Sequence, residues 1–264
     1  MMGSSEHIRA ALESAVKKVT SGKDVAVAFS GGVDSGLIAA LADKYANGVE
    51  LYTVGTVGSY DVINSEHAST ELKLKWNHVE LSEENIESIL REMIRVTGTV
   101  SPLTLSFEVP TFCVTKFCKA EHIIGGIGAD ELFAGYHKYI GMTEQEFLEA
   151  RDKDLKRLLT SVAAHEDKAA EHFKKKIYRP FTDPDVTEIA LLLSFEKIEP
   201  KDETSRKKIL RTIALDMGYG FLAEAKKKAA QYGSGTTDLI KSISKKSGMI
   251  PSEYISKLCH EELD

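Results

Sequence analysis

The sequence has few cysteines, and their spacing matches neither a structural zinc site nor a dithiol redox centre. Its three cysteines, Cys113, Cys118 and Cys259, include no Cys-x-x-Cys spacing. That spacing marks structural zinc sites and dithiol redox centres, so neither is expected here. A sparse, odd number of cysteines is typical of a reducing compartment. We therefore expect all three to be buried or inert thiols.

Long apolar stretches are also missing. The longest apolar run, residues 189–193, is much too short to cross a bilayer. Residues 1–20 are charged and lack the apolar segment of a signal peptide. These absences predict a cytoplasmic protein without a membrane partner.

An excess of basic residues is absent as well. The chain of 264 residues carries a formal net charge of -6. An acidic balance argues against broad binding of nucleic acids or anionic membranes. The composition, 42% hydrophobic and 28% charged, is that of an ordinary globular protein. The length suits one large domain or a domain with a sizeable appendage.

Short apolar runs alternate with amphipathic stretches in the first half of the chain. Four of these runs predict buried strands: residues 25–29, 51–54, 78–81 and 122–124. Helices are expected between them at about residues 35–47, 62–75 and 107–119, and another opens with a capping-box pattern at residues 82–85. This alternation predicts an α/β fold, a parallel sheet with helices on both faces. Ligands bind such sheets at the carboxyl ends of the strands.

After Glu131 the periodicity is helical and predicts no further strand. Helices are expected at residues 144–176, 186–193, 204–217, 221–231, 237–246 and 252–261. We therefore predict an α/β domain over residues 1–140. A helical C-terminal lobe over residues 141–264 would complete its active site.

A glycine-rich segment, Ser30-Gly31-Gly32-Val33-Asp34-Ser35, follows the first predicted strand and leads into a helix. Glycines let backbone N–H groups approach an anion closely, and a helix N-terminus adds partial positive charge. The serine hydroxyls can donate to phosphate oxygens. Asp34 would repel a bare phosphate, so it fits such a site only by holding a metal ion. The alternative is a simple turn with Asp34 or Ser35 as helix cap, but the complete six-residue pattern favours phosphate binding.

This segment resembles the PP-loop of the ATP pyrophosphatase superfamily, which includes asparagine synthetases, NAD synthetases and several tRNA-modifying enzymes. The resemblance implies an adenine nucleotide alpha hydrolase-like fold. It also implies cleavage of ATP between the α and β phosphates, with transfer of AMP to a substrate oxygen and release of pyrophosphate.

A second glycine-rich segment, residues 125–136, resembles the most diagnostic motif of the asparagine synthetase branch. It reads Gly-Gly-Ile-Gly-Ala-Asp-Glu-Leu-Phe-Ala-Gly-Tyr. By this resemblance Asp130 is a Mg²⁺ ligand that faces Asp34 across the pyrophosphate, and Gly126 lets the nucleotide lie close to the backbone. Two carboxylates from two strand ends can hold one hard cation on the phosphates. Phe133 and Tyr136 are expected to pack in the helix that follows.

Three shorter segments extend the resemblance. Val54 and Gly55 resemble the family's backbone site for adenine. Lys207 and Arg211 resemble its Lys-x-x-Leu-Arg helix, and Lys228 resembles the lysine beside the pyrophosphate, where it would stabilise charge on the leaving group. We predict Lys228 and Lys207 as catalytic residues, with the register of Lys228 open by one residue. The alternative for Val54 and Gly55 is a simple strand end. For Lys207 and Arg211 it is a solvated basic face, and for Lys228 an exposed helix end.

Two departures from the family pattern leave the acceptor open. The second loop carries Ile127 where the family usually has glutamate. The short segment before the first strand has no room for a glutaminase domain with its N-terminal cysteine. The resemblance therefore implies a stand-alone synthetase that uses free ammonia, a separate glutaminase subunit or another amine.

The predicted function is that of an AMP-forming amide ligase that uses ATP and Mg²⁺. It would adenylate a carboxylate such as aspartate and then amidate it. Two alternatives stay open. One is a PP-loop adenylating enzyme acting on a tRNA base, a cofactor precursor or an intramolecular amine. The other is an ATP-binding subunit without catalysis. The sequence does not fix the oligomeric state, and a homo-oligomer is compatible with it.

Overall fold

The computed structural model describes residues 3–226 and 229–263, and within them five strands form one sheet. The strands are β1 (Asp24–Ala28), β2 (Gly48–Gly55), β3 (Lys75–Glu80), β4 (His122–Ile124) and β5 (Lys176–Tyr178). They lie in the order β3-β2-β1-β4-β5, and every neighbouring pair is parallel. The predicted parallel α/β architecture is confirmed.

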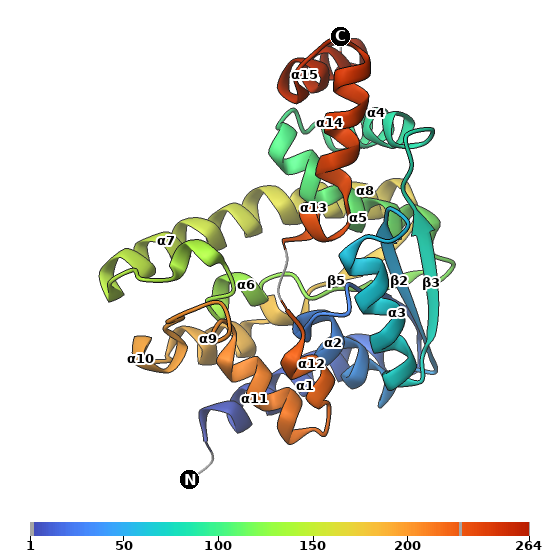
Figure 1. Ribbon diagram of the computed structural model, residues 1–264. Coiled ribbons are helices and arrows are strands. Elements are labelled where there is room, and N and C mark those ends of the chain that lie inside the picture. The colour runs from blue at the N-terminus through green and yellow to red at the C-terminus, as the bar shows by residue number, and fades with distance from the viewer. Residues whose placement is uncertain (1–2, 227–228, 264) are drawn as a thin grey trace.

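Helices occupy the connections and surround the sheet (Figure 1). Those before residue 140 are α1 (Ser4–Thr20), α2 (Val33–Asp43), α3 (Tyr60–Leu72), α4 (Ile86–Thr97), α5 (Pro102–Phe117), α6 (Ala129–Leu132) and the 3₁₀ turn η1 (His137–Tyr139). The next are α7 (Glu144–Arg157), the π-helical turn η2 (Leu158–Val162), α8 (Ala163–His172), the 3₁₀ turn η3 (Pro180–Thr182), α9 (Pro184–Leu191) and α10 (Phe195–Ile198). The last are α11 (Lys208–Asp216), α12 (Gly220–Glu224), α13 (Ala230–Gly233), α14 (Thr236–Lys246) and α15 (Pro251–Leu263).

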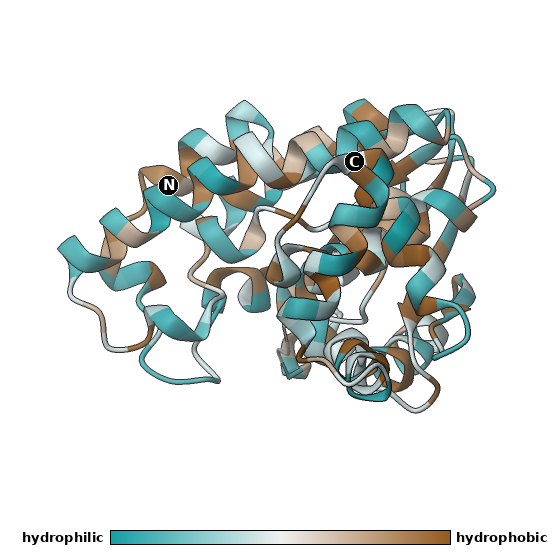
Figure 2. Cartoon of the chain, turned by 90° about the horizontal axis from the view of Figure 1, so that it is seen from above, coloured by the Kyte–Doolittle hydropathy of each residue, from teal (hydrophilic) through white to brown (hydrophobic). Residues whose placement is uncertain are grey.

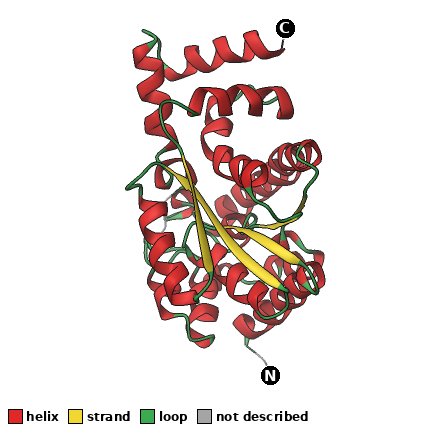
Figure 3. Cartoon of the chain, turned by 90° about the vertical axis from the view of Figure 1, so that its right-hand side faces the viewer, coloured by secondary structure: helices red, strands yellow, loops and turns green. Residues whose placement is uncertain are grey.

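Two hydrophobic cores lie on opposite faces of the sheet, because successive side chains of a strand point to opposite faces. Val25 and Val27 of β1 join a core with α1, α2, α9, α11 and α12, whereas Ala26 joins one with α4, α5, α8, α14 and α15. Figure 3 shows helices on both sides of the strands. The helices in Figure 2 carry hydrophobic and hydrophilic residues in alternation, as expected when one face is buried. C-terminal helices thus contribute to both cores.

The strand order creates a switch point between β1 and β4. After β3, at one edge of the sheet, the chain crosses through α4 and α5 to β4 on the other side of β1. The register pairs Val27 with Ile124, so the loops that follow β1 and β4 leave the sheet side by side. Ligands bind parallel α/β sheets at such switch points. Both predicted loops lie there.

The expectation of no strand after Glu131 is wrong. β5 pairs with β4 in parallel and forms an edge of the sheet. Its three residues, Lys-Ile-Tyr, are too few to show a strand period. The expected helix over residues 144–176 ends before it at His172, and a π turn interrupts it. The proposed division at residue 140 remains a prediction, but the segment after it supplies this fifth strand.

Several predicted helices begin or end elsewhere. α5 starts at Pro102, not near residue 107, because Ser101 caps it and proline is acceptable at the first helical position. α4 starts at Ile86, directly after the expected capping box, and its N-cap is Asn85 instead of Ser82. The helix expected over residues 221–231 is two short ones, α12 and α13. α6 ends at Leu132, so Phe133 and Tyr136 lie beyond it and not within a helix that follows the second loop.

One expectation from composition agrees with the structure. All three cysteines are buried, and burial raises the pKa of the Cys113 thiol to about 12. No described helix combines the length and apolar character that crossing a bilayer requires.

The contact between α2 and α12 predicts the effect of a glycine substitution. A Cβ on Gly36 of α2 would lie 2.3 Å from a Leu222 methyl group of α12. We expect Gly36→Ala to lower the free energy of unfolding by about 1–3 kcal/mol, because overpacking outweighs the gain in helix propensity. Chemical denaturation measures the change. Gly220→Ala is the matched control, because a Cβ there meets no atom within 4 Å. Equal stability of both variants would contradict the argument.

Candidate functional site

The first loop joins β1 to α2 and presents the helix N-terminus at the switch point. Gly32 is the N-cap of α2, and Asp34 is its second residue. Gly31 has φ +72°, and a Cβ on it would lie 2.6 Å from the Asn64 side chain, so the turn requires glycine. The Ser30 N–H donates to the buried Ser35 hydroxyl at 3.2 Å, which holds the loop closed. Ser30 itself is exposed and lines a pocket with Gly32 and Asp34.

The second loop packs directly on the first. A Cβ on Gly126 would lie 3.0 Å from the Asp34 Cβ and 3.1 Å from the Ser35 nitrogen. Gly126 therefore allows the two loops to touch, which places the N-terminus of α6 beside that of α2. Asp130 is the second residue of α6.

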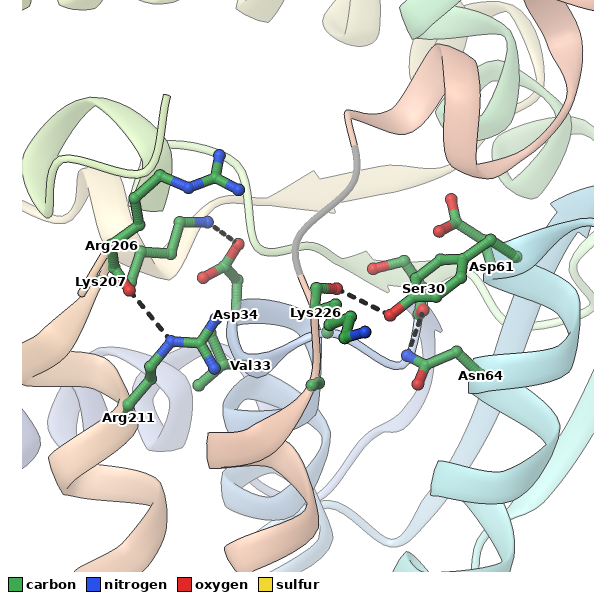
Figure 4. Close-up of a pocket in the computed structure, with 12 residues that line it drawn as sticks. Ser30, Val33, Asp34, Asp61, Asn64, Arg206, Lys207, Arg211 and Lys226 are labelled. Atoms are coloured by element: carbon green, nitrogen blue, oxygen red, sulfur yellow. Dashed lines mark hydrogen bonds and ion pairs between the residues drawn. The ribbon is translucent and has the colours of Figure 1, made fainter. Parts of the chain in front are cut away.

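Asp34 and Asp130 converge on one lysine. The Lys207 ammonium forms ion pairs with Oδ2 of Asp34 and, at 2.8 Å, with Oδ1 of Asp130. The Lys207 side chain is only 1% exposed. Gly135 makes this possible, because a Cβ there would lie 2.0 Å from the Asp130 Oδ1 and 2.1 Å from the Lys207 Cε. Figure 4 shows Lys207 reaching toward Asp34.

Further cations surround the pocket. The side chains of Arg206, Lys207, Arg211 and Lys226 line it together with Asp34 and Asp61. Arg206 donates to the Gly135 carbonyl at 2.9 Å, and the Nε of Arg211 donates to the Arg206 carbonyl at 3.0 Å. Burial lowers the pKa of Arg211 from its usual value. Among the described lining residues four cations face two carboxylates, so the pocket favours a polyanion.

The opposite wall comes from the N-terminal part of α3 (Figure 4). Tyr60 donates from its hydroxyl to the Lys226 carbonyl at 2.9 Å, and Asn64 donates to the Ser30 carbonyl at 3.3 Å. Asp61 is 8% exposed and lies against Gly233, where a Cβ would be 2.2 Å from its Oδ1. These contacts tie the C-terminal segment to the first loop across the pocket.

Other predicted site residues lie differently. Ser35 is 5% exposed and organises the loop instead of lining the pocket. Val54 is buried, and the Gly55 carbonyl accepts from the His78 ring at 2.9 Å and from the Leu81 N–H at 3.0 Å. Neither Val54 nor Gly55 lines the pocket, so their contact with adenine stays a prediction. Lys228 lies outside the described residues.

The carboxylates suit a magnesium ion. Both point at one positive charge, the Lys207 ammonium, in a pocket built for anions. Mg²⁺ is commonly held by one or two carboxylates, with phosphate oxygens and water as its other ligands. Among the described residues no group of three or more His, Cys, Asp and Glu side chains could hold a metal ion.

Two of the polar lining residues, Arg206 and Asn64, escaped sequence reasoning. Arg206 directly precedes the Lys-x-x-Leu-Arg segment, and Asn64 lies in the middle of an amphipathic helix. Tyr60 and Asp61 follow the turn after β2. The place of Tyr60 and Asp61 after a strand end was a signal in the sequence, whereas nothing in it distinguished Asn64.

Comparisons with known proteins agree with these loops. The family model described as asparagine synthase matches residues 7–150, more than half of the chain. The chain belongs to the asparagine synthase family. It is 31% identical to a putative asparagine synthetase [glutamine-hydrolyzing] 1 of Methanocaldococcus jannaschii, over 98% of this chain and 54% of that protein. The chain therefore spans about half the length of this relative.

Two more distant similarities were found. A carboxyethyl-arginine beta-lactam-synthase of Streptomyces clavuligerus is 24% identical over 87% of this chain and 44% of that protein. A solved structure of an NMN synthetase from Francisella tularensis covers 86% of this chain and 99% of its own, with 9% identity and a TM-score of 0.38.

A second cluster of polar side chains, from α5 and α8, surrounds a small cavity between these helices. Glu108 is 5% exposed and within 3.0 Å of the His165 ring, and the neighbouring Glu166 accepts from Arg179 at 2.6 Å. Burial, with a contribution from Glu166, raises the pKa of Glu108 to about 8. Burial lowers the pKa of His165. Glu108 is therefore mostly protonated at neutral pH.

Gly135 predicts a sensitive position in the second loop. We expect Gly135→Ala to push Lys207 away from Asp130, lowering the free energy of unfolding by about 1–3 kcal/mol and weakening ATP binding. Chemical denaturation and titration with ATP measure the two effects. Gly125→Ala is the matched control, because its Cβ would make an ordinary contact of 3.8 Å with the Ala28 Cβ. Unchanged stability and binding in Gly135→Ala would contradict the geometry.

Glu108 predicts a pH dependence of stability. Between the usual glutamate pKa and about 8, the folded state keeps a proton that the unfolded state releases, so stability falls as pH rises. His165 contributes the opposite slope, but only below its usual pKa of 6.5. From pH 6.5 to 8 we expect wild type to lose about 1 kcal/mol per pH unit relative to Glu108→Gln. Denaturation at several pH values measures this, with the exposed Glu144→Gln as control. Parallel curves for wild type and Glu108→Gln would refute it.

Proposed function

We propose that the protein is a cytoplasmic, ATP-dependent amide ligase of the asparagine synthetase type. One observation carries the proposal: two loops at the switch point bring Asp34 and Asp130 onto Lys207, which lines a pocket together with three further cationic side chains. The family membership supports the same activity. ATP is the proposed cosubstrate, and aspartate is the first candidate for the carboxylate.

The binding step follows from the pocket. The ATP phosphates lie at the N-terminus of α2, where Ser30 and the loop amides can donate hydrogen bonds. Arg206, Arg211 and Lys226 offset the negative charge of the phosphates. Mg²⁺ held by Asp34 and Asp130 would neutralise the phosphates further.

The chemistry has two steps. A substrate carboxylate oxygen attacks the α phosphorus, the bond from that phosphorus to the bridging oxygen breaks, and pyrophosphate leaves. Ammonia or an amine then attacks the acyl carbon, AMP leaves and the nitrogen gives up a proton. The protein contributes position and electrostatics, because cations fixed around the pyrophosphate stabilise the charge that develops on it. We propose this role for Lys207, which lines the pocket, and for Lys228.

A different acceptor is the second candidate. Ile127 occupies the position where the family usually has glutamate, and it is partly exposed beside the two loops. The similarity to a beta-lactam synthase fits a family in which acceptors differ. Under this alternative the adenylation site is the same, but the amine belongs to another molecule or to the substrate itself. Under the first candidate, the nitrogen would come from free ammonia or from a separate glutaminase subunit.

Exchange of labelled pyrophosphate into ATP tests adenylation. With the correct carboxylate present, wild type should catalyse exchange, and Asp34→Asn or Asp130→Asn should lower its rate on the order of 10²-fold, since each removes a charge from the site of pyrophosphate release. Asp43→Asn is the control, because this exposed residue lies at the far end of α2 from Asp34. A panel of amino acids, with aspartate first, provides the carboxylates.

The outcomes separate the candidates. Formation of asparagine from aspartate and ammonia supports the first candidate, whereas exchange without asparagine supports a different acceptor. Tight ATP binding without exchange for any carboxylate would sink the ligase proposal and leave a nucleotide-binding subunit. Equal losses in Asp43→Asn and Asp34→Asn would remove the argument from the carboxylate pair.

A further inference from the structure

Lys207 is buried at the place where a cation is needed. Its side chain is 1% exposed, and its ammonium contacts carboxylates from α2 and α6, which start at two different strand ends. Two carboxylates that share a desolvated site repel each other unless a cation lies between them. The ammonium therefore keeps Asp34 and Asp130 in their present positions.

The backbone around Lys207 is specialised for this placement. Lys207 has φ +57°, a conformation that non-glycine residues seldom adopt, and it is the N-cap of α11. Arg206, itself 6% exposed, is fixed by its bond to the Gly135 carbonyl. Such a backbone is energetically unfavourable and persists only where surrounding contacts impose it. The second loop and α11 thus act together to direct the lysine at the carboxylates.

We propose that Lys207 is the resident counter-ion of the metal carboxylates, a positioning residue that Mg²⁺ must displace from them. This inference rests on the metal site of the proposed function. The two carboxylates carry two negative charges, which a divalent ion balances alone, so the bound metal would repel the ammonium from them. Lys207 thereby weakens binding of the metal alone and ties metal binding to the nucleotide. The phosphates accept the displaced ammonium.

Metal binding in the absence of nucleotide tests the proposal. Mn²⁺, a paramagnetic substitute for Mg²⁺, is titrated into the full chain and followed by electron paramagnetic resonance. Lys207→Gln should bind Mn²⁺ about tenfold more tightly than wild type, because the competing charge is gone. Lys207→Arg keeps the charge and should bind Mn²⁺ like wild type. Lys208→Gln is the matched control, since Lys208 is the exposed neighbour on α11.

Stability gives a second readout. Without metal, Lys207→Gln should melt at a lower temperature than wild type, and Mn²⁺ should raise its Tm more than that of wild type. If Lys207→Gln does not fold alone, Lys207→Met replaces it, and refolding with Mn²⁺ should rescue either variant. Equal or weaker Mn²⁺ affinity in the variants, or failure of Mn²⁺ to restore stability, would overturn the proposal.

The test is independent of turnover. If Lys207→Gln binds Mn²⁺ more tightly and wild type catalyses no pyrophosphate exchange with any carboxylate, the ligase function is refuted and this inference stands. Pyrophosphate exchange by wild type, together with unaltered Mn²⁺ affinity in Lys207→Gln, would support the ligase function and overturn this inference.

Discussion

The attraction between one buried ammonium and two carboxylates is the interaction on which the site depends. Asp34 and Asp130 are far apart in sequence, and only the reversal of strand order between β1 and β4 brings their loops together. Lys207 then joins them from a third segment. Without the lysine, the two carboxylates would face each other with no ammonium between them, and this repulsion is costly in a protein interior. The strand order therefore determines where the charged side chains of the site meet.

Glycines at close contacts allow this arrangement. Gly126 lets the second loop touch the first, and Gly135 lets the stem of Lys207 pass beside Asp130. Both belong to the same twelve-residue segment, which explains why that segment is so informative in the sequence. The phosphate chemistry could be met by several glycine-rich turns. Fewer sequences meet the steric demands of two touching loops and a buried lysine than meet those of phosphate binding.

The loops and the parallel sheet could be predicted from sequence because each depends on local pattern. The strands around Val27 and Ile124 are short apolar runs, and the loops follow them directly. β5 could not be predicted, because three residues at a sheet edge have no period of their own and depend on pairing with β4. The division of residues 221–231 into α12 and α13 depends likewise on packing beyond the segment. Arg206 and Asn64 enter the pocket only through tertiary contacts, so no spacing marked them.

The acidic and the basic side chains of the site come from different parts of the chain. The carboxylates and the loops lie within residues 7–150, which the family model matches, whereas Arg206, Lys207, Arg211 and Lys226 follow them. A sheet with its two loops would present mainly acidic side chains at the switch point and would repel a nucleotide without metal. The C-terminal helices reverse that balance, and they are also part of both hydrophobic cores. Packing of these helices on the sheet is thus inseparable from assembly of an anion-binding pocket, so a change in the C-terminal core reaches the site through the cations it positions.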